Sequence, residues 1–163
     1  MSGCKQNPKI NEAMRTDIEN SVLCWLATVD ADGTPNVTPK EIFSAYGDDR
    51  IIVADIASTN TVRNIQSHPK VCVSFIDVFR QRGFKIVGHA TILDPNSSAF
   101  AEVGADLLKM VDGDFTIRNL ISIQIEKVSR IWAPSYTHFP ERTEDERMLS
   151  AYKTYGVTAG KVV

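Results

Sequence analysis

The fold is decided by residues 51–76, which read IIVADIASTNTVRNIQSHPKVCVSFI. An apolar strand over Arg50–Asp55 leads into the polar run Ser58–Thr61, which offers several possible helix N-caps. Val62 and Ile65 indicate a short helix, which ends before Pro69 because the residue preceding proline avoids the α region. The apolar run from Val71 to Ile76 is the next strand. This stretch therefore predicts a strand, a helix and a strand.

The residues before this stretch predict a helix and a pair of strands. Ile10, Met14 and Ile18 recur every four residues, which indicates an amphipathic helix over 9–20. Val22–Val29 is rich in apolar residues and ends at DADG, whose Asp and Gly residues are typical of a turn. Asn36–Tyr46 is predicted as one returning strand, so the two segments form a β-hairpin.

The residues after it predict two more strands and two helices. The strand Phe84–Leu93 is followed by a helix that begins near Asp94. Its apolar face carries Phe100, Val103, Leu107 and Met110. Ile121, Ile123 and Ile125 alternate with polar residues, which is the pattern of a half-buried strand. Residues Glu141 to Tyr155 are predicted as a charged C-terminal helix.

Six strands with few helices favour a mainly β fold with flanking helices. A small closed or partly closed barrel is expected, because closure removes exposed strand edges. A length of 163 residues suits one domain, and no internal repeat or linker divides the chain. We therefore expect residues 1–163 to form a single domain with a helical tail from about 141.

The composition excludes several classes of function. Hydrophobic residues make up 43% of the chain, and the formal net charge is −2. No positive field exists to hold nucleic acid or an anionic membrane surface. No apolar run approaches the ~18 residues of a membrane span, and the polar N-terminus has no targeting signal. Cys4, Cys24 and Cys72 form no disulfide framework, which predicts a reduced, cytoplasmic protein.

The sequence contains none of the common catalytic or metal-binding motifs. His68, His89 and His138 have no spacing that would suit zinc, so no metal site is predicted. Neither a GxxxxGK[ST] loop nor a GxGxxG fingerprint is present, which argues against a P-loop or a Rossmann nucleotide site.

Three features could nevertheless hold a phosphate-bearing ligand. Ser58–Thr61 stands at a helix start, where free N–H groups attract phosphate; a plain helix cap is the alternative interpretation. Thr38-Pro39-Lys40 contains a proline, which belongs at a strand edge or bulge because it cannot donate a backbone hydrogen bond. Such a strand leaves backbone groups free for a ligand; an irregular edge strand with a solvated lysine is the alternative interpretation. Arg80, Arg82 and Lys85 could neutralise a dianion or be solvated.

Taken in order, these segments resemble a known family. The runs LATVDADGTPNVTPKEIF, IIVADIASTNTVRNIQSHPKVCVSF and RGFKIVGHATIL are similar to the FMN-binding split barrel of the pyridoxamine 5'-phosphate oxidase superfamily, over roughly residues 10–130. The most specific match is Asn64-Ile65, then His68-Pro69, then Val71; Gly88 and Ala90 add a weaker G-x-A step.

The resemblance implies a six-stranded Greek-key split β-barrel that forms a homodimer, with FMN held at the subunit interface. It implies that Thr38, Pro39 and Lys40 meet the flavin ring or ribityl chain, with Asp55 at the end of the third strand. Ser58, Thr59, Asn60 and Thr61 would approach the phosphate, and Arg82 and Lys85 are further candidate contacts.

The sequence departs from many members of this family at the phosphate anchor. Asn60 and Thr61 stand where those members carry a basic pair, so neutral hydrogen bonds replace two charge-assisted ones. Lys40, Arg63, Arg82 or Lys85 must then supply the charge, or FMN is bound weakly. The C-terminal Trp and Arg pattern of true pyridoxamine phosphate oxidases is not recognisable around Trp132.

We therefore expect a flavoprotein that acts as an oxidoreductase on a small substrate. No catalytic acid or base can be named, which suits a reaction carried mainly by the flavin. Two alternatives remain open: a non-catalytic flavin carrier, and a split barrel that binds a deazaflavin or haem. For haem, His89 and His138 are the obvious ligands.

Overall fold

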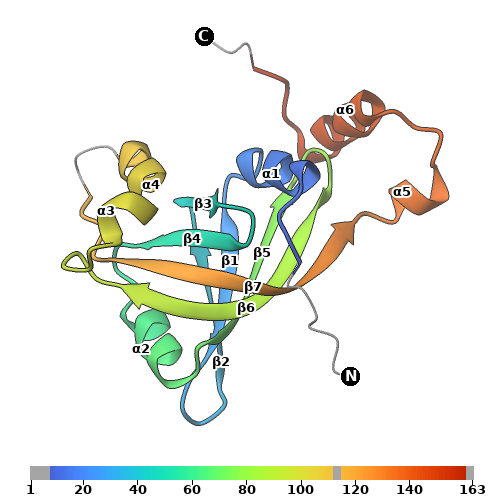
Figure 1. Cartoon of the computed structure of the whole chain (residues 1–163). Coiled ribbons are helices and arrows are strands. Elements are labelled where there is room, and N and C mark those ends of the chain that lie inside the picture. Colours follow the sequence, from blue (N-terminus) through green and yellow to red (C-terminus); the bar gives the residue numbers. More distant parts are fainter. Residues whose placement is uncertain (1–7, 112–114, 161–163) are drawn as a thin grey trace, which may run out of the picture.

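The computed structural model describes residues 8–111 and 115–160, which form a mainly β fold with flanking helices (Figure 1). The strands are β1 (Cys24–Val29), β2 (Pro35–Lys40), β3 (Phe43–Tyr46), β4 (Arg50–Asp55), β5 (Lys70–Asp77), β6 (Arg82–Leu93) and β7 (Asn119–Trp132). The helices are α1 (Glu12–Glu19), α2 (Thr59–Ser67), α3 (Phe100–Val103), α4 (Ala105–Met110), α5 (Ser135–His138) and α6 (Glu144–Tyr155).

All seven strands belong to one antiparallel sheet, in the order β2-β1-β5-β6-β7-β4-β3. β2 and β3 are consecutive in the chain and yet occupy the two opposite edges. Only Glu41 and Ile42 join them, so the sheet must curl until its edges approach each other. The result is a half-barrel (Figure 1).

The prediction of six strands was wrong at this junction. The sequence suggests one strand over Asn36–Tyr46, but β2 pairs with β1 and β3 pairs with β4. One continuous strand could not pair with β1 at one edge of the sheet and with β4 near the other. The strand is therefore interrupted at Glu41 and Ile42, and the described residues form seven strands.

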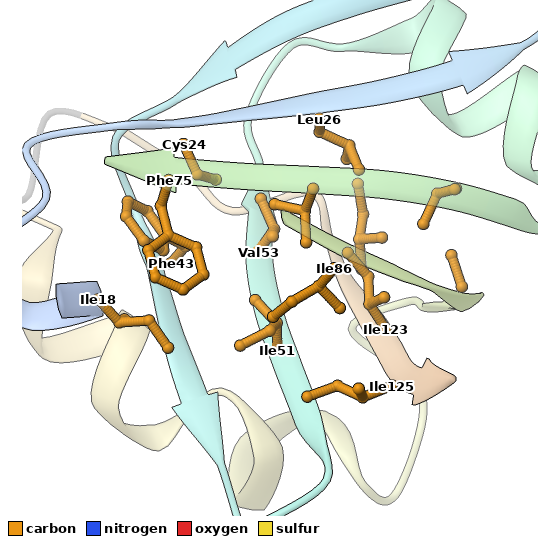
Figure 2. Packing of buried hydrophobic residues seen from close by; sticks show 14 of the residues in the cluster. Ile18, Cys24, Leu26, Phe43, Ile51, Val53, Phe75, Ile86, Ile123 and Ile125 are labelled. Atoms are coloured by element: carbon orange, nitrogen blue, oxygen red, sulfur yellow. The ribbon is translucent and has the colours of Figure 1, made fainter. Parts of the chain in front are cut away.

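The main core fills the concave side of the curled sheet. Figure 2 shows Leu26, Val53, Phe75, Ile86 and Ile123 pointing toward one another from five different strands. A second, smaller cluster lies beneath α3 and α4, where Ile52 and Ala54 pack with Val103, Leu107 and Leu120. β4 therefore contributes to both clusters with alternate residues, which explains its uninterrupted apolar sequence.

The helices differ from prediction in number as well as at their ends: α5 was not predicted. The helix expected after Asp94 is two short helices, α3 and α4, separated by Gly104; a Cβ at that glycine would lie 2.7 Å from Leu120 Cδ1. The C-terminal helix begins at Glu144 instead of Glu141, because Thr143 and Glu146 form a reciprocal capping box there. No helix of the described residues is both long and apolar enough to cross a bilayer.

The convex face of the sheet carries large apolar side chains that remain exposed. Trp25 on β1, Val37 on β2 and Ile76 on β5 retain 45%, 57% and 37% of their accessible surface. Cys72 and Val87 lie half-buried on the same face, since they alternate with inward residues along β5 and β6. We call these five residues, Trp25, Val37, Cys72, Ile76 and Val87, the convex patch; they lie on the four neighbouring strands β2, β1, β5 and β6.

Candidate functional site

The site is built around the N-terminus of α2. Ser58 precedes the helix and makes no side-chain capping bond; its backbone N–H instead donates to Oδ1 of Asp55 at 2.8 Å. The N–H groups of the first helical turn have no acceptor within the helix and point out of its end. Because these N–H groups also form the positive end of the helix dipole, they favour an anion.

Lys40 approaches the same point from the last position of β2. The residue is buried, and its Nζ donates a hydrogen bond to Oγ of Ser58. Burial lowers the pKa of the Lys40 ammonium, while the nearby Asp55 carboxylate acts in the opposite direction. Among the described residues, no carboxylate lies within the 4.0 Å of an ion pair with this ammonium.

Asp55 is held in place from the other side. Its Oδ2 accepts a hydrogen bond of 2.9 Å from Nδ2 of Asn119, and its backbone oxygen accepts one of 2.8 Å from the N–H of Arg118. The two oxygens of the Asp55 carboxylate thus accept hydrogen bonds from Ser58 and Asn119. The carboxylate therefore orients the start of α2, and it forms no ion pair with Lys40.

A network of neutral side chains joins β1, β2 and α2 beside this cluster. The Oγ1 atoms of Thr38 and Thr61 are 3.2 Å apart, and Nδ2 of Asn36 donates to Oγ1 of Thr38 at 3.3 Å. Nδ2 of Asn64, which is buried, donates to Oγ1 of Thr28 at 3.0 Å. The network fixes α2 against the hairpin without adding any charge.

Three adjoining hollows meet at Ser58, and together we call them the Ser58 groove. The first, of about 350 Å³, lies between the ends of β2 and β4 and is lined by Pro39, Lys40, Ile42, Ala54, Ser58 and Phe115. The second, of about 420 Å³, is lined by Asn36, Thr38, Ala57, Ser58, Thr59, Asn60 and Thr61. The third, of about 330 Å³, includes Asp55, Ser58, Thr59, Arg63, Arg118 and Asn119. Hollows of this size suit a small molecule or a cofactor.

The structure brings together eight of the ten residues suggested by the sequence. Thr38, Pro39, Lys40, Asp55 and the run Ser58–Thr61 all line the Ser58 groove. Arg82 does not line it: the guanidinium donates from Nε to Asp17 at 2.9 Å and from Nη1 to Glu144 at 2.6 Å. Lys85 is exposed on the convex face, opposite Ser74 on β5.

Sequence reasoning missed Arg118 and Asn119. Arg118 immediately precedes β7 and Asn119 begins it, and the register of β4 with β7 sets Asn119 opposite Asp55. No local motif marks them, because their contact with Asp55 spans 64 residues of chain.

The groove offers few groups that could carry acid–base or nucleophilic chemistry. Burial raises the pKa of the Cys24 thiol to about 12, so this thiol stays protonated at neutral pH. His68, His89 and His138 are all exposed, and none lines the groove. The donor set of the Lys40 ammonium, the Arg63 and Arg118 guanidinium groups, helix N–H groups and neutral hydroxyls suits the binding of a phosphorylated polar ligand.

Comparison with known proteins identifies a family and several solved structures that share this half-barrel fold. Residues 10–132 match the family model described as Pyridoxamine 5'-phosphate oxidase. HupZ of Group A Streptococcus is 26% identical, with a TM-score of 0.64 over 76% of this chain and 95% of that one. A search of curated proteins finds no match.

Two structures with lower identity share the fold alone. An FMN-binding protein of Syntrophomonas wolfei is 20% identical, with a TM-score of 0.64 over 75% of this chain and 86% of that one. HutZ of Vibrio cholerae, named a haem storage protein, is 19% identical, with a TM-score of 0.58 over 76% of this chain and 94% of that one.

Proposed function

Since the chain belongs to the pyridoxamine 5'-phosphate oxidase family, we propose that it is an FMN-binding flavoprotein that exchanges electrons with a small-molecule substrate. The observation that carries this proposal is the convergence of Lys40, the N-terminus of α2 and a row of neutral hydrogen-bonding side chains on one groove.

In this proposal each part of the groove has a separate task. The phosphate is bound at Ser58, Thr59, Asn60 and Thr61, while Asp55 keeps the start of α2 in position through Ser58. Thr38, Pro39 and Lys40 run along the flavin ring or ribityl chain. Bound FMN supplies the hydride or electron transfer, and the protein holds, orients and shields it. We assign no catalytic acid or base.

Arg82 and Lys85 do not line the Ser58 groove. The guanidinium of Arg82 is already bonded to Asp17 and Glu144, so we propose a structural role for it in place of a ligand contact. Lys85 is exposed to solvent on the convex face. It could contact the cofactor only if the cofactor lay at an interface between two copies of the chain.

We propose that this second copy packs on the convex patch and makes a homodimer with the cofactor at the interface. Trp25, Val37 and Ile76 are large apolar side chains on three neighbouring strands, and water is a poor environment for them. A symmetric dimer would bury the patch against itself. We further propose that the chain forms one domain and works in the cytoplasm, where its free Cys24 and Cys72 stay reduced.

The direct test is the visible spectrum of the purified protein, followed by titration with FMN while flavin fluorescence is recorded. We expect a yellow protein, or saturable quenching at about one flavin per chain. Stopped-flow reduction of the bound flavin by NADH or NADPH then separates an oxidoreductase from a flavin carrier. A colourless protein that does not quench flavin fluorescence on titration with FMN would contradict the proposal.

A charge variant tests whether the phosphate is held at α2. Thr59→Glu adds a carboxylate at an exposed position of the first helical turn, where an acid is compatible with the helix dipole. We expect it to weaken FMN binding by about tenfold or more through repulsion of the phosphate. Thr154→Glu on α6, also exposed, is the matched control. Equal FMN affinity in both variants would argue against an anchor at α2.

The second candidate is a split barrel that binds haem or a deazaflavin. The neutral residues at Asn60 and Thr61 favour it, and the fold neighbour HutZ is named a haem storage protein. Haem would need a ligand such as His89 or His138, which stand on β6 and α5 away from the Ser58 groove. A Soret band that persists in the His89→Ala and His138→Ala variants would exclude both as ligands.

A further inference from the structure

A further hollow, of about 420 Å³, lies between α1, β3 and α4, two helices that both pack against β3 (Figure 1). We call it the α1 hollow; its lining includes Ile18 and Glu19 of α1, Glu41, Phe43 of β3 and Met110 of α4. Glu41 also lines the part of the Ser58 groove between the ends of β2 and β4, so the two spaces adjoin at this residue. The volume suits a small molecule.

One part of the lining is apolar. Ile18 and Phe43 are buried core residues, and Figure 2 shows them beside each other at the edge of the core. Ala45 of β3 packs against the same core, and Met110 adds a thioether side chain that is 53% exposed. A flexible, polarizable methionine adapts to ligands of different shape. The α1 hollow can therefore hold the apolar body of a ligand.

The charged groups around the α1 hollow are mostly negative. Glu19, Glu41 and Asp106 line it, and among the described residues neither glutamate forms an ion pair. Asp106 pairs at 3.0 Å with an exposed lysine on its own helix. Arg15 is the only cation of the described lining, and its Nη2 donates to the backbone oxygen of Gly47. Charges of one sign around a hollow raise the local concentration of the opposite charge.

The arrangement of these carboxylates favours an organic cation over a metal ion. Within residues 8–111 and 115–160, no group of three or more His, Cys, Asp or Glu side chains is placed to hold a metal. Glu19 stands on α1, Glu41 between β2 and β3, and Asp106 on α4. A protonated amine has three N–H donors, so it can bond to carboxylates that come from different elements.

We propose that the α1 hollow binds a small organic cation, a protonated amine with an apolar body. Glu19 and Glu41 accept hydrogen bonds from the ammonium, while Phe43 and Met110 contact the apolar body. Because Glu41 borders both spaces, the amine lies next to a ligand in the Ser58 groove. The inference rests on the proposed function only where it names an amine as the class of the substrate, since binding of the amine needs no flavin.

The first test compares benzylamine, which is protonated at neutral pH, with benzyl alcohol, which has a similar shape and no charge. Protein labelled with ¹³C at the methionine methyl groups is titrated with each, and the Met110 signal is assigned by its loss in Met110→Leu. We expect a saturable shift with benzylamine, binding about tenfold weaker or more for benzyl alcohol, and no shift of Met148 on α6. No shift up to tens of millimolar benzylamine, or equal binding of the alcohol, overturns the proposal.

The second test removes single carboxylates. We expect Glu19→Gln and Glu41→Gln each to weaken benzylamine binding by about three- to tenfold, because both carboxylates are exposed, and to leave benzyl alcohol binding within about twofold of wild type. Glu141→Gln, which changes an exposed carboxylate outside the hollow, is the matched control. Unchanged benzylamine affinity in both hollow variants would contradict the proposal.

The outcomes separate this inference from the flavoprotein assignment. If the protein binds benzylamine and no FMN, the flavin assignment fails and the amine site stands. If FMN binds and benzylamine does not shift the Met110 signal, the flavin assignment stands and the amine site fails. If both bind, benzylamine should also change the visible spectrum of the bound flavin; an unchanged spectrum would overturn the amine as the class of the substrate.

Discussion

The guanidinium of Arg82 donates from Nε to Oδ1 of Asp17 over 2.9 Å, although 65 residues separate the two in sequence. Asp17 is buried on α1, with a side chain that is 1% exposed, and Arg82 opens β6 with a side chain that is 19% exposed. Nη1 of Arg82 reaches Glu144 on α6. A residue that the sequence suggested as a phosphate contact therefore ties two helices to the sheet.

This arrangement predicts that Arg82→Met destabilises the fold without a specific effect on flavin. Removing the guanidinium leaves the buried Asp17 carboxylate without its partner, and we expect a loss of roughly 3 kcal/mol in the free energy of unfolding. Urea denaturation measures the loss, with the exposed Lys127→Met as control. FMN affinity of the folded fraction should stay within about twofold of wild type. A large loss of affinity with unchanged stability would restore Arg82 as a ligand contact.

The buried ammonium of Lys40 predicts a particular dependence of stability on pH. Its pKa is lowered in the folded state, chiefly by burial, from the 10.5 of the unfolded chain. Between the two values the unfolded state binds more protons, so the contribution of Lys40 to stability rises with pH. At neutral pH, without a ligand, Lys40→Met should therefore be more stable than wild type, and this advantage should shrink as pH rises toward 10.5.

The measurement is urea denaturation of both proteins at several pH values, because their difference cancels the titration of other groups. The titratable neighbours of Lys40 are Asp55 and Cys24, and the pKa of Cys24, at about 12, lies above the window. A difference that is constant from neutral pH to 10.5 would mean that Lys40 titrates normally in the folded protein.

Gly88 is predicted to tolerate no side chain. A Cβ there would lie 2.3 Å from the backbone oxygen of Gln124, at the point where β6 and β7 shift register. Gly88→Ala must therefore push two central strands apart, and we expect a loss of about 2 kcal/mol or more in the free energy of unfolding. Gly160→Ala, whose Cβ would meet no atom within 4 Å, is the control. Equal melting temperatures for the two variants would contradict this prediction.

If the convex patch is the dimer interface, a charge introduced into it should change the oligomeric state of the protein. Trp25→Glu sets a carboxylate in the middle of the proposed interface, so it should convert a dimer into a monomer by light scattering coupled to size exclusion. Leu149→Glu replaces an even more exposed apolar residue, 65% accessible against 45% for Trp25, on α6 and should leave the dimer intact. A monomeric wild-type protein would refute the proposed dimer outright.

The local sequence determined much of what surrounds the site. The order strand, polar turn, short helix, proline and strand across residues 51–76 is present in β4, α2 and β5 because each element follows from local rules of burial and capping. The same local rules placed Ser58 and Thr61 at the start of a helix, and they placed Thr38 and Lys40 on an edge strand. A family resemblance could then be read from those segments in order.

Only the tertiary structure decided which charges meet. Local patterns cannot distinguish a lysine that points into the half-barrel from one that points to solvent on its convex face, and Lys40 and Lys85 differ in just this way. Nor can they predict that β2 and β3 diverge at Glu41 and Ile42, that Arg82 pairs with Asp17, or that Asn119 holds Asp55. These relationships depend on strand register and on the curl of the sheet, which bring together residues that are far apart in the chain.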